Sequence, residues 1–118
     1  MREKPRDIGR LLHIMQAIEN IEEFTVNVNY EMFMNQKILF FAIVKNVEII
    51  GEAVYMLTKE FKQNRPEIPW EDIARMRHIL VHDYYNITPA RVWDTINNDI
   101  PELRPYIVKY INELSEEQ

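Results

Sequence analysis

The sequence predicts an all-α fold, in which one domain of residues 1–118 forms a four- to five-helix up-and-down bundle. Three observations support this prediction. A chain of 118 residues is long enough for one hydrophobic core and too short for two domains. Apolar residues recur at steps of three and four along most of it. Residues 25–30 alternate apolar and polar side chains as a strand would, but the sequence offers no second strand to pair with them.

The first helix is expected over residues 6–24, because its apolar residues form the stripe of an amphipathic helix. That stripe consists of Ile8, Leu11, Leu12, Met15, Ile18, Ile21 and Phe24. A connector over residues 25–30 leads into a long second helix, which is expected to start at Tyr30 or Asn35 and to end at Phe61. This helix is apolar on nearly every side, which is typical of the centre of a bundle or of a subunit interface.

Prolines predict where the third helix begins. Pro66 and Pro69 should end the long helix and start a new one over residues 69–85, because proline suits a first helical turn and disfavours helix in the residue before it. Glu71 and Asp72 follow in the first turn, where the helix dipole favours carboxylates.

Thr88 and Pro89 predict the N-cap and the first position of a fourth helix. Pro101 and Pro105 are expected to interrupt or kink the chain that follows, so that a fifth helical segment ends near residue 114.

The two glycines and the absence of cysteine exclude several classes of protein. Gly9 and Gly51 stand too far apart for a Walker loop or a dinucleotide-binding motif. Zinc fingers, thiol catalysis and disulfide frameworks all need cysteine. The longest apolar run is residues 38–44, well short of the roughly 20 residues that span a bilayer, and the first residues lack a secretory signal. We therefore expect a cytoplasmic protein that does not enter a membrane.

Gly51 lies inside the most apolar helix, where glycine costs about 0.5 to 1 kcal/mol relative to alanine. A glycine at such a position indicates the close approach of another backbone. Glu48 and Glu52, on the same helix, are expected to be structural partners of Arg75 or Arg77.

The formal net charge of −5 argues against a general nucleic-acid binder, which normally presents a basic surface to phosphates. The charge is unevenly distributed, however. Residues 75–91 carry Arg75, Arg77 and Arg91 against Asp83 as the single acidic residue. The sequence thus contains a small basic region in an acidic chain.

Two histidines on the third helix, His78 and His82, have the spacing of a metal-binding pair. A metal site needs a third ligand, and Ile79 stands where a metalloprotease motif has its glutamate. The sequence therefore predicts no metal and no cofactor.

Arg77 and His82 together suit metal-free RNA cleavage. A histidine can take the proton of a 2′-hydroxyl, and an arginine can hold the scissile phosphate and stabilise its developing charge. In the alternative interpretation, the arginine is an exposed ion-pair former beside a capping or half-buried histidine. On one helix the two side chains differ by about 140° in direction, whereas Arg77 and Tyr84 differ by about 20°. A two-fold dimer could bring the arginine of one subunit near the histidine of the other.

The spacing Arg77-x4-His82-x-Tyr84 resembles the RX4HXY motif of the HepT-like toxins, which belong to the HEPN superfamily of small helical ribonucleases. The resemblance covers about residues 30–110. Residues 47–53 resemble the second-helix signature of that family, residues 66–70 its interhelical loop, and residues 92–103 its C-terminal helix.

This resemblance implies a homodimeric, metal-independent endoribonuclease that acts as the toxin of a toxin–antitoxin pair. Arg77 and His82 would be its catalytic residues, in a cleft where the two subunits meet. The partner would be an MNT-type minimal nucleotidyltransferase, which silences the toxin by transferring AMP to Tyr84. His78 stands where the family commonly has asparagine, and is a candidate supporting residue.

Two alternatives accompany this interpretation. Tyr84 could instead belong to an aromatic packing cluster with Tyr85 and Trp93. The whole protein could be a non-catalytic helical dimer that binds a nucleotide or docks a nucleotidyltransferase, which would suit its net acidity.

Overall fold

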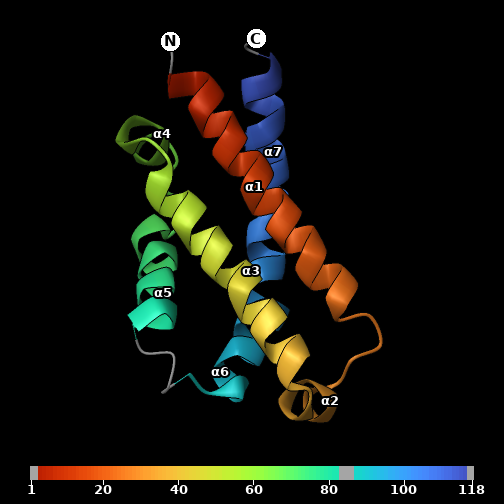
Figure 1. The fold of residues 1–118 in the computed structure, drawn as a ribbon. Coiled ribbons are helices and arrows are strands. Elements are labelled where there is room, and N and C mark those ends of the chain that lie inside the picture. The colour runs from red at the N-terminus through yellow and green to blue at the C-terminus, as the bar shows by residue number, and fades with distance from the viewer. Residues whose placement is uncertain (1–2, 83–86, 117–118) are drawn as a thin grey trace.

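The computed structural model describes residues 3–82 and 87–116, with side chains described for residues 7–79 and 87–116. These residues form helices and no strand (Figure 1). The elements in order are α1 (Glu3–Phe24), α2 (Tyr30–Asn35), α3 (Lys37–Met56), α4 (Lys59–Gln63), α5 (Trp70–His82), α6 (Pro89–Asp94), the π-helical segment η2 (Thr95–Asp99) and α7 (Ile100–Glu116).

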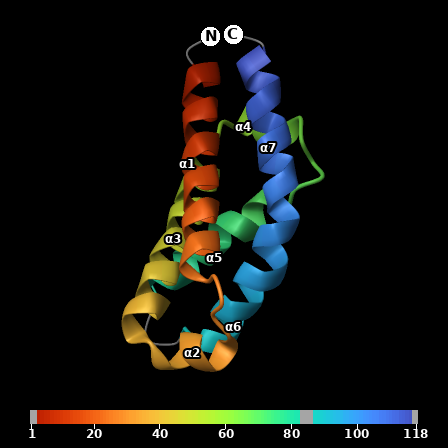
Figure 2. The ribbon, with the colours of Figure 1, turned by 90° about the vertical axis from the view of Figure 1, so that its right-hand side faces the viewer.

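The four long helices α1, α3, α5 and α7 alternate in direction, so the predicted up-and-down bundle is confirmed (Figure 1). The central helix is α3, which packs against α1 on one side and α5 on the other. Figure 2 shows α1 and α7 side by side, and both termini lie at the same end of the molecule. The shorter elements α2 and α6 close the opposite end.

The core fills the space between α1, α3 and α7. Of the stripe predicted for the first helix, Leu11, Ile18 and Ile21 are buried in this core. Leu12 and Phe24 were predicted with them but are 51% and 39% exposed, and Ile14, which was not predicted, is fully buried. Burying one Leu or Ile side chain contributes about 1.5 to 3 kcal/mol. The most completely buried side chains of the core are Tyr110, Phe33, Leu11, Ile14, Ile18, Ile43, Ile50, Ile107 and Val54.

An aromatic cluster fastens the segment before α5 to α7. The rings of Phe61, Trp70 and Tyr110 pack against one another, and the guanidinium of Arg65 lies 4.0 Å from the centre of the Phe61 ring. Trp70 donates its indole N–H to the carbonyl of Arg65 at 2.9 Å. The Tyr110 hydroxyl donates to Oε2 of Glu67 at 2.5 Å, which lowers the pKa of Glu67. These contacts fix where α5 begins.

The predicted long helix from Tyr30 or Asn35 to Phe61 is wrong, because the chain divides there into α2, α3 and α4. Gln36 and Leu57 have extended backbones, with ψ angles of 94° and 145°, and they separate the three helices. Side-chain caps, which the apolar pattern does not reveal, start the shorter pieces.

Two such caps are clear. Asn29 accepts the Met32 N–H at 2.9 Å at the start of α2, and Thr58 accepts the Phe61 N–H at 3.2 Å at the start of α4. Asp7 of α1 holds Thr58 in turn, since its carboxylate accepts the Thr58 N–H at 2.9 Å and hydroxyl at 2.7 Å.

The predicted start of the fourth helix is confirmed, because Thr88 accepts the Arg91 N–H at 3.3 Å and Pro89 opens α6. The predicted interruption near Pro101 takes the form of η2, where the Ile100 N–H donates to the Thr95 carbonyl. A proline has no N–H to complete an α-helical bond, so a wider turn accommodates it. Helix α7 nevertheless continues through Pro105 to Glu116.

Candidate active site around Arg77

Helix α5 lies unusually close to α3 at Gly51. A Cβ atom placed on Gly51 would lie 3.2 Å from both the Cα and the N atoms of Arg77, and closer still to its Cβ. Only glycine fits there without a shift of one helix. The close approach that Gly51 predicts is therefore confirmed, and the backbone against which it packs is that of Arg77.

The side chain of Arg77 is held by Glu52 of α3. Its Nε lies 2.7 Å from Oε2 of Glu52, and both atoms are shielded from solvent although the side chains are 35% and 46% exposed. The Nε–H is not aimed at the carboxylate, so the contact is an ion pair without a hydrogen bond.

Of the two glutamates expected to pair with Arg75 or Arg77, Glu52 does so and Glu48 does not. Glu48 lies 3.4 Å from Nζ of Lys45, and Arg75 lies 3.2 Å from Asp72 on its own helix. Both of these pairs join residues three apart on one helix, and such neighbours meet more readily than residues on separate helices.

Arg77 opens into a cavity of about 200 Å³ between α1, α3 and α5, which we call the basic cavity. It is lined by Arg10, His13, Lys45, Glu48, Ile49, Glu52, Ala53 and Arg77. Sequence patterns did not associate Arg10 and His13 with Arg77, although the three-residue spacing of Arg10 and His13 places them on one face of the first helix.

The other predicted site residues are only partly within the structure. His82 is the last residue of α5, about 7.5 Å beyond Arg77 along the helix axis, and its side chain is not among those described. Tyr84 lies outside the described residues. His78 is exposed on α5 and lines a wide surface hollow with Arg75 and Arg77. Trp93, considered as a partner of Tyr84, packs against Phe33, with ring centres 5.1 Å apart.

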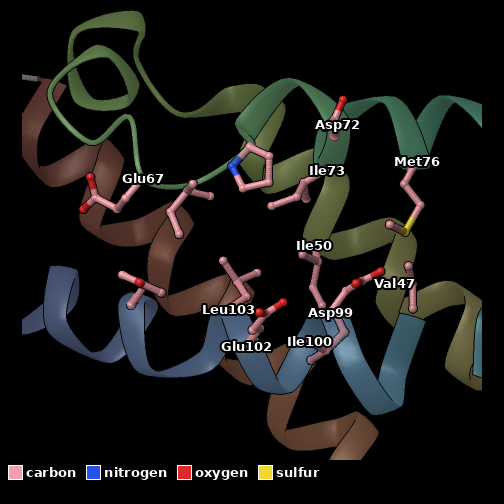
Figure 3. A pocket seen from close by; sticks show the side chains of 13 residues that line it. Val47, Ile50, Glu67, Asp72, Ile73, Met76, Asp99, Ile100, Glu102 and Leu103 are labelled. Carbon is pink, nitrogen blue, oxygen red and sulfur yellow. The ribbon is translucent and has the colours of Figure 1, made fainter. Parts of the chain in front are cut away.

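A larger cavity of about 500 Å³ lies between α5 and α7, with Val47 and Ile50 of α3 at its base (Figure 3). We call it the acidic cavity, because carboxylates line it and no basic residue does. Those carboxylates belong to Glu67, Asp72, Asp99 and Glu102. A cavity of this charge repels phosphate, so it is not a candidate RNA site.

Asp99 is unusual within the acidic cavity. Desolvation of its carboxyl and the negative charges of Asp94 and Glu102 raise its pKa, although the residue as a whole is exposed. The folded protein thus binds this proton more tightly than the unfolded chain does. The resulting stability is present at low pH and is lost as the pH rises through the folded-state pKa.

We expect Asp99→Asn to raise the Tm at pH 7, because it removes a charge that the fold disfavours. The gain should shrink as the pH is lowered, because the wild-type carboxyl of Asp99 then takes up a proton and loses its charge. Thermal melts between pH 4 and 8 measure this, with Glu116→Gln as an exposed control. An equal gain at both ends of the range would contradict the assignment.

Two further features bear on the kind of protein. Among the described side chains, which are those of residues 7–79 and 87–116, no three His, Asp or Glu are grouped so as to hold a metal ion. No helix in the same part of the chain is long and apolar enough to cross a membrane.

Comparison with known proteins identifies the family. The family model described as "Ribonuclease HepT-like" matches residues 14–110. The chain therefore belongs to the HepT-like ribonuclease family, as its RX4HXY motif predicts. No solved structure matches it.

Several curated proteins are similar. "Probable ribonuclease HepT" of Thermococcus cleftensis is 44% identical over 77% of this chain and 83% of its own length. "Putative RNase MJ1216" of Methanocaldococcus jannaschii is 36% identical over 92% of this chain and 91% of its own. "Gamma-glutamylcyclotransferase and putative RNase MJ0434" of the same organism is 38% identical over 88% of this chain, which spans only 47% of that longer protein.

Proposed function

We propose that this protein is a metal-independent endoribonuclease in which Arg77 and His82 carry out the cleavage, and that it is the toxin of a toxin–antitoxin pair. The observation that carries this proposal is the placement of Arg77. Its backbone is set by the contact with Gly51, its Nε by Glu52, and its side chain borders the basic cavity of an otherwise acidic chain. Membership of a ribonuclease family supports the same function.

The proposed chemistry needs one base and one cation. His82 takes the proton from a ribose 2′-hydroxyl, and the freed oxygen attacks the neighbouring phosphorus. The guanidinium of Arg77 stabilises the negative charge that develops on the phosphate oxygens. The bond from phosphorus to the 5′-oxygen then breaks, which leaves a 2′,3′-cyclic phosphate and, after protonation of the leaving oxygen, a 5′-hydroxyl.

A homodimer is part of this proposal, because α3 presents an exposed face along its whole length. Its large apolar residues are Ile38, Phe41 and Tyr55. Ile38 is 88% exposed, Phe41 56% and Tyr55 64%. Large apolar side chains that face solvent along one helix are typical of a protein–protein contact. Such a contact would run past Glu52 and so past Arg77.

We further propose that an MNT-type nucleotidyltransferase neutralises the toxin by transferring AMP to Tyr84. In the sequence, Tyr84 comes two residues after His82, the last residue of the helix that carries Arg77. An adenylate esterified there would add negative phosphate close to where the RNA phosphate binds and would repel it. Chains bearing AMP on Tyr84 are then expected to lose cleavage in the assay below.

The function is tested by incubating RNA with the protein in excess EDTA. We expect the wild type to cleave, and His82→Ala to lose cleavage by about 100-fold or more, which is the range that a general base contributes. Thermal melts of both proteins control for folding. Equal cleavage by wild type and His82→Ala would refute the role of His82. Cleavage by neither would favour the non-catalytic dimer that binds a nucleotide or docks a nucleotidyltransferase.

A further inference from the structure

We propose that Arg10, His13 and Lys45 form, together with Arg77, a binding site for the RNA backbone phosphates that flank the cleaved bond. This inference rests on the proposed ribonuclease function and extends it to residues of α1. Arg10 and His13 precede residues 14–110, which the family model matches. The family match therefore does not assign them a role.

The first argument is position. Arg10 and His13 are three residues apart on α1, so they point to the same side of that helix. Because α1 packs along α3, this side meets Lys45 and the Arg77–Glu52 pair in the basic cavity. Donors from three helices therefore converge on one space of about 200 Å³ beside the candidate catalytic arginine.

The second argument is charge. The two carboxylates of the basic cavity are already paired, Glu48 with Lys45 at 3.4 Å and Glu52 with Arg77 at 2.7 Å. Among the residues that the structure describes, neither Arg10 nor His13 forms an ion pair or a hydrogen bond. Arg10 is nevertheless half-buried. A partly desolvated cation that lacks a counter-ion among the described residues favours an anionic ligand.

The third argument is the contrast with the acidic cavity. That cavity is larger but carries Glu67, Asp72, Asp99 and Glu102 and no basic residue. Of these two cavities, only the basic one offers a guanidinium and an ammonium to a phosphate. A strand with its scissile phosphate at Arg77 would place neighbouring phosphates along α1, within reach of Arg10 and His13.

The test uses a fluorescent 20-nucleotide RNA in which every ribose is 2′-O-methylated, so that it binds but has no 2′-hydroxyl to react. Its Kd is measured by fluorescence anisotropy at several KCl concentrations. We expect Arg10→Gln to weaken binding about four-fold at 0.15 M salt. The slope of the logarithm of the binding constant against the logarithm of the salt concentration should become shallower by about 0.7, which corresponds to the loss of one phosphate contact on a single strand. The double variant Arg10→Gln/His13→Gln should weaken binding further.

Lys109→Gln, on the exposed side of α7, removes the same charge outside the basic cavity and should leave the Kd and the slope close to those of the wild type. On cleavable RNA, Arg10→Gln should raise KM and leave kcat unchanged, because it removes binding that is equal in the ground and transition states. Thermal melts show whether each variant is folded.

The proposal is overturned if Arg10→Gln and Lys109→Gln give the same Kd and slope, or if the wild type does not bind the methylated RNA. Binding that depends on Arg10 in a wild type that cleaves no RNA would support the phosphate site and refute the ribonuclease function. Cleavage by the wild type, together with binding that does not depend on Arg10, would support the ribonuclease function and refute the phosphate site.

Discussion

Mixing Arg77→Ala chains with His82→Ala chains should restore RNA cleavage that neither variant shows alone. Each single variant is expected to lose at least about 100-fold in kcat, the usual loss when a group that stabilises or deprotonates the reacting centre is removed. The rescue is expected because positions 77 and 82 differ by about 140° around an ideal helix, which would not aim both side chains at one phosphate. A two-fold dimer pairs the arginine of one protomer with the histidine of its partner.

The expected level of rescue follows from counting sites. Random exchange makes half of the dimers mixed, and each mixed dimer has one complete site out of two, so about a quarter of wild-type activity should return. Native mass spectrometry shows whether mixed dimers have formed. Mixing Arg77→Ala with the double variant Arg77→Ala/His82→Ala should restore nothing. If mixed dimers form and stay inactive, the site lies within a single protomer.

Gly51→Leu should destabilise the fold and abolish cleavage together. The added Cβ atom would already lie 3.2 Å from the Cα and N atoms of Arg77. The remaining atoms of a leucine side chain would fit only if α3 and α5 moved apart. Overpacking of this kind costs about 3 kcal/mol or more, which for a chain of this size lowers the Tm by about 10 °C or more.

Gly9→Leu is the matched control, because a Cβ on Gly9 would meet nothing within 4 Å. Replacing glycine by a better helix former inside α1 should leave the Tm unchanged or raise it slightly. Equal melting temperatures for wild type and Gly51→Leu would show that the contact between α3 and α5 does not constrain position 51.

The sequence predicts the bundle well where regular periodicity decides the structure. The first helix and the cap at Thr88 follow from local patterns, and both are present. The division of the long helix at Leu57 does not follow from a local pattern, because it depends on a contact between Asp7 and Thr58, which are 51 residues apart. An apolar pattern read along the chain contains no information about such a contact.

The candidate site likewise has some features that the sequence predicts and others that it does not. The pairing of Arg77 with Glu52 and the close approach at Gly51 were predictable, because a glycine and a glutamate inside an apolar helix both need an explanation. The convergence of Arg10 and His13 on Arg77 was not predictable, since it depends on how α1 lies along α3. The pairing of Arg77 with His82 stays a prediction.

The two cavities lie on opposite faces of α3, since Val47 lines one and Ile49 lines the other, and these two positions differ by roughly 200° around the helix. The molecule is therefore electrically polarised across its central helix. Although the net charge of −5 repels RNA at long range, this polarity would turn an approaching strand so that it meets the α1 side first. The acidic face would then discourage unproductive encounters, and this orienting effect should weaken as added salt shortens the range of the field.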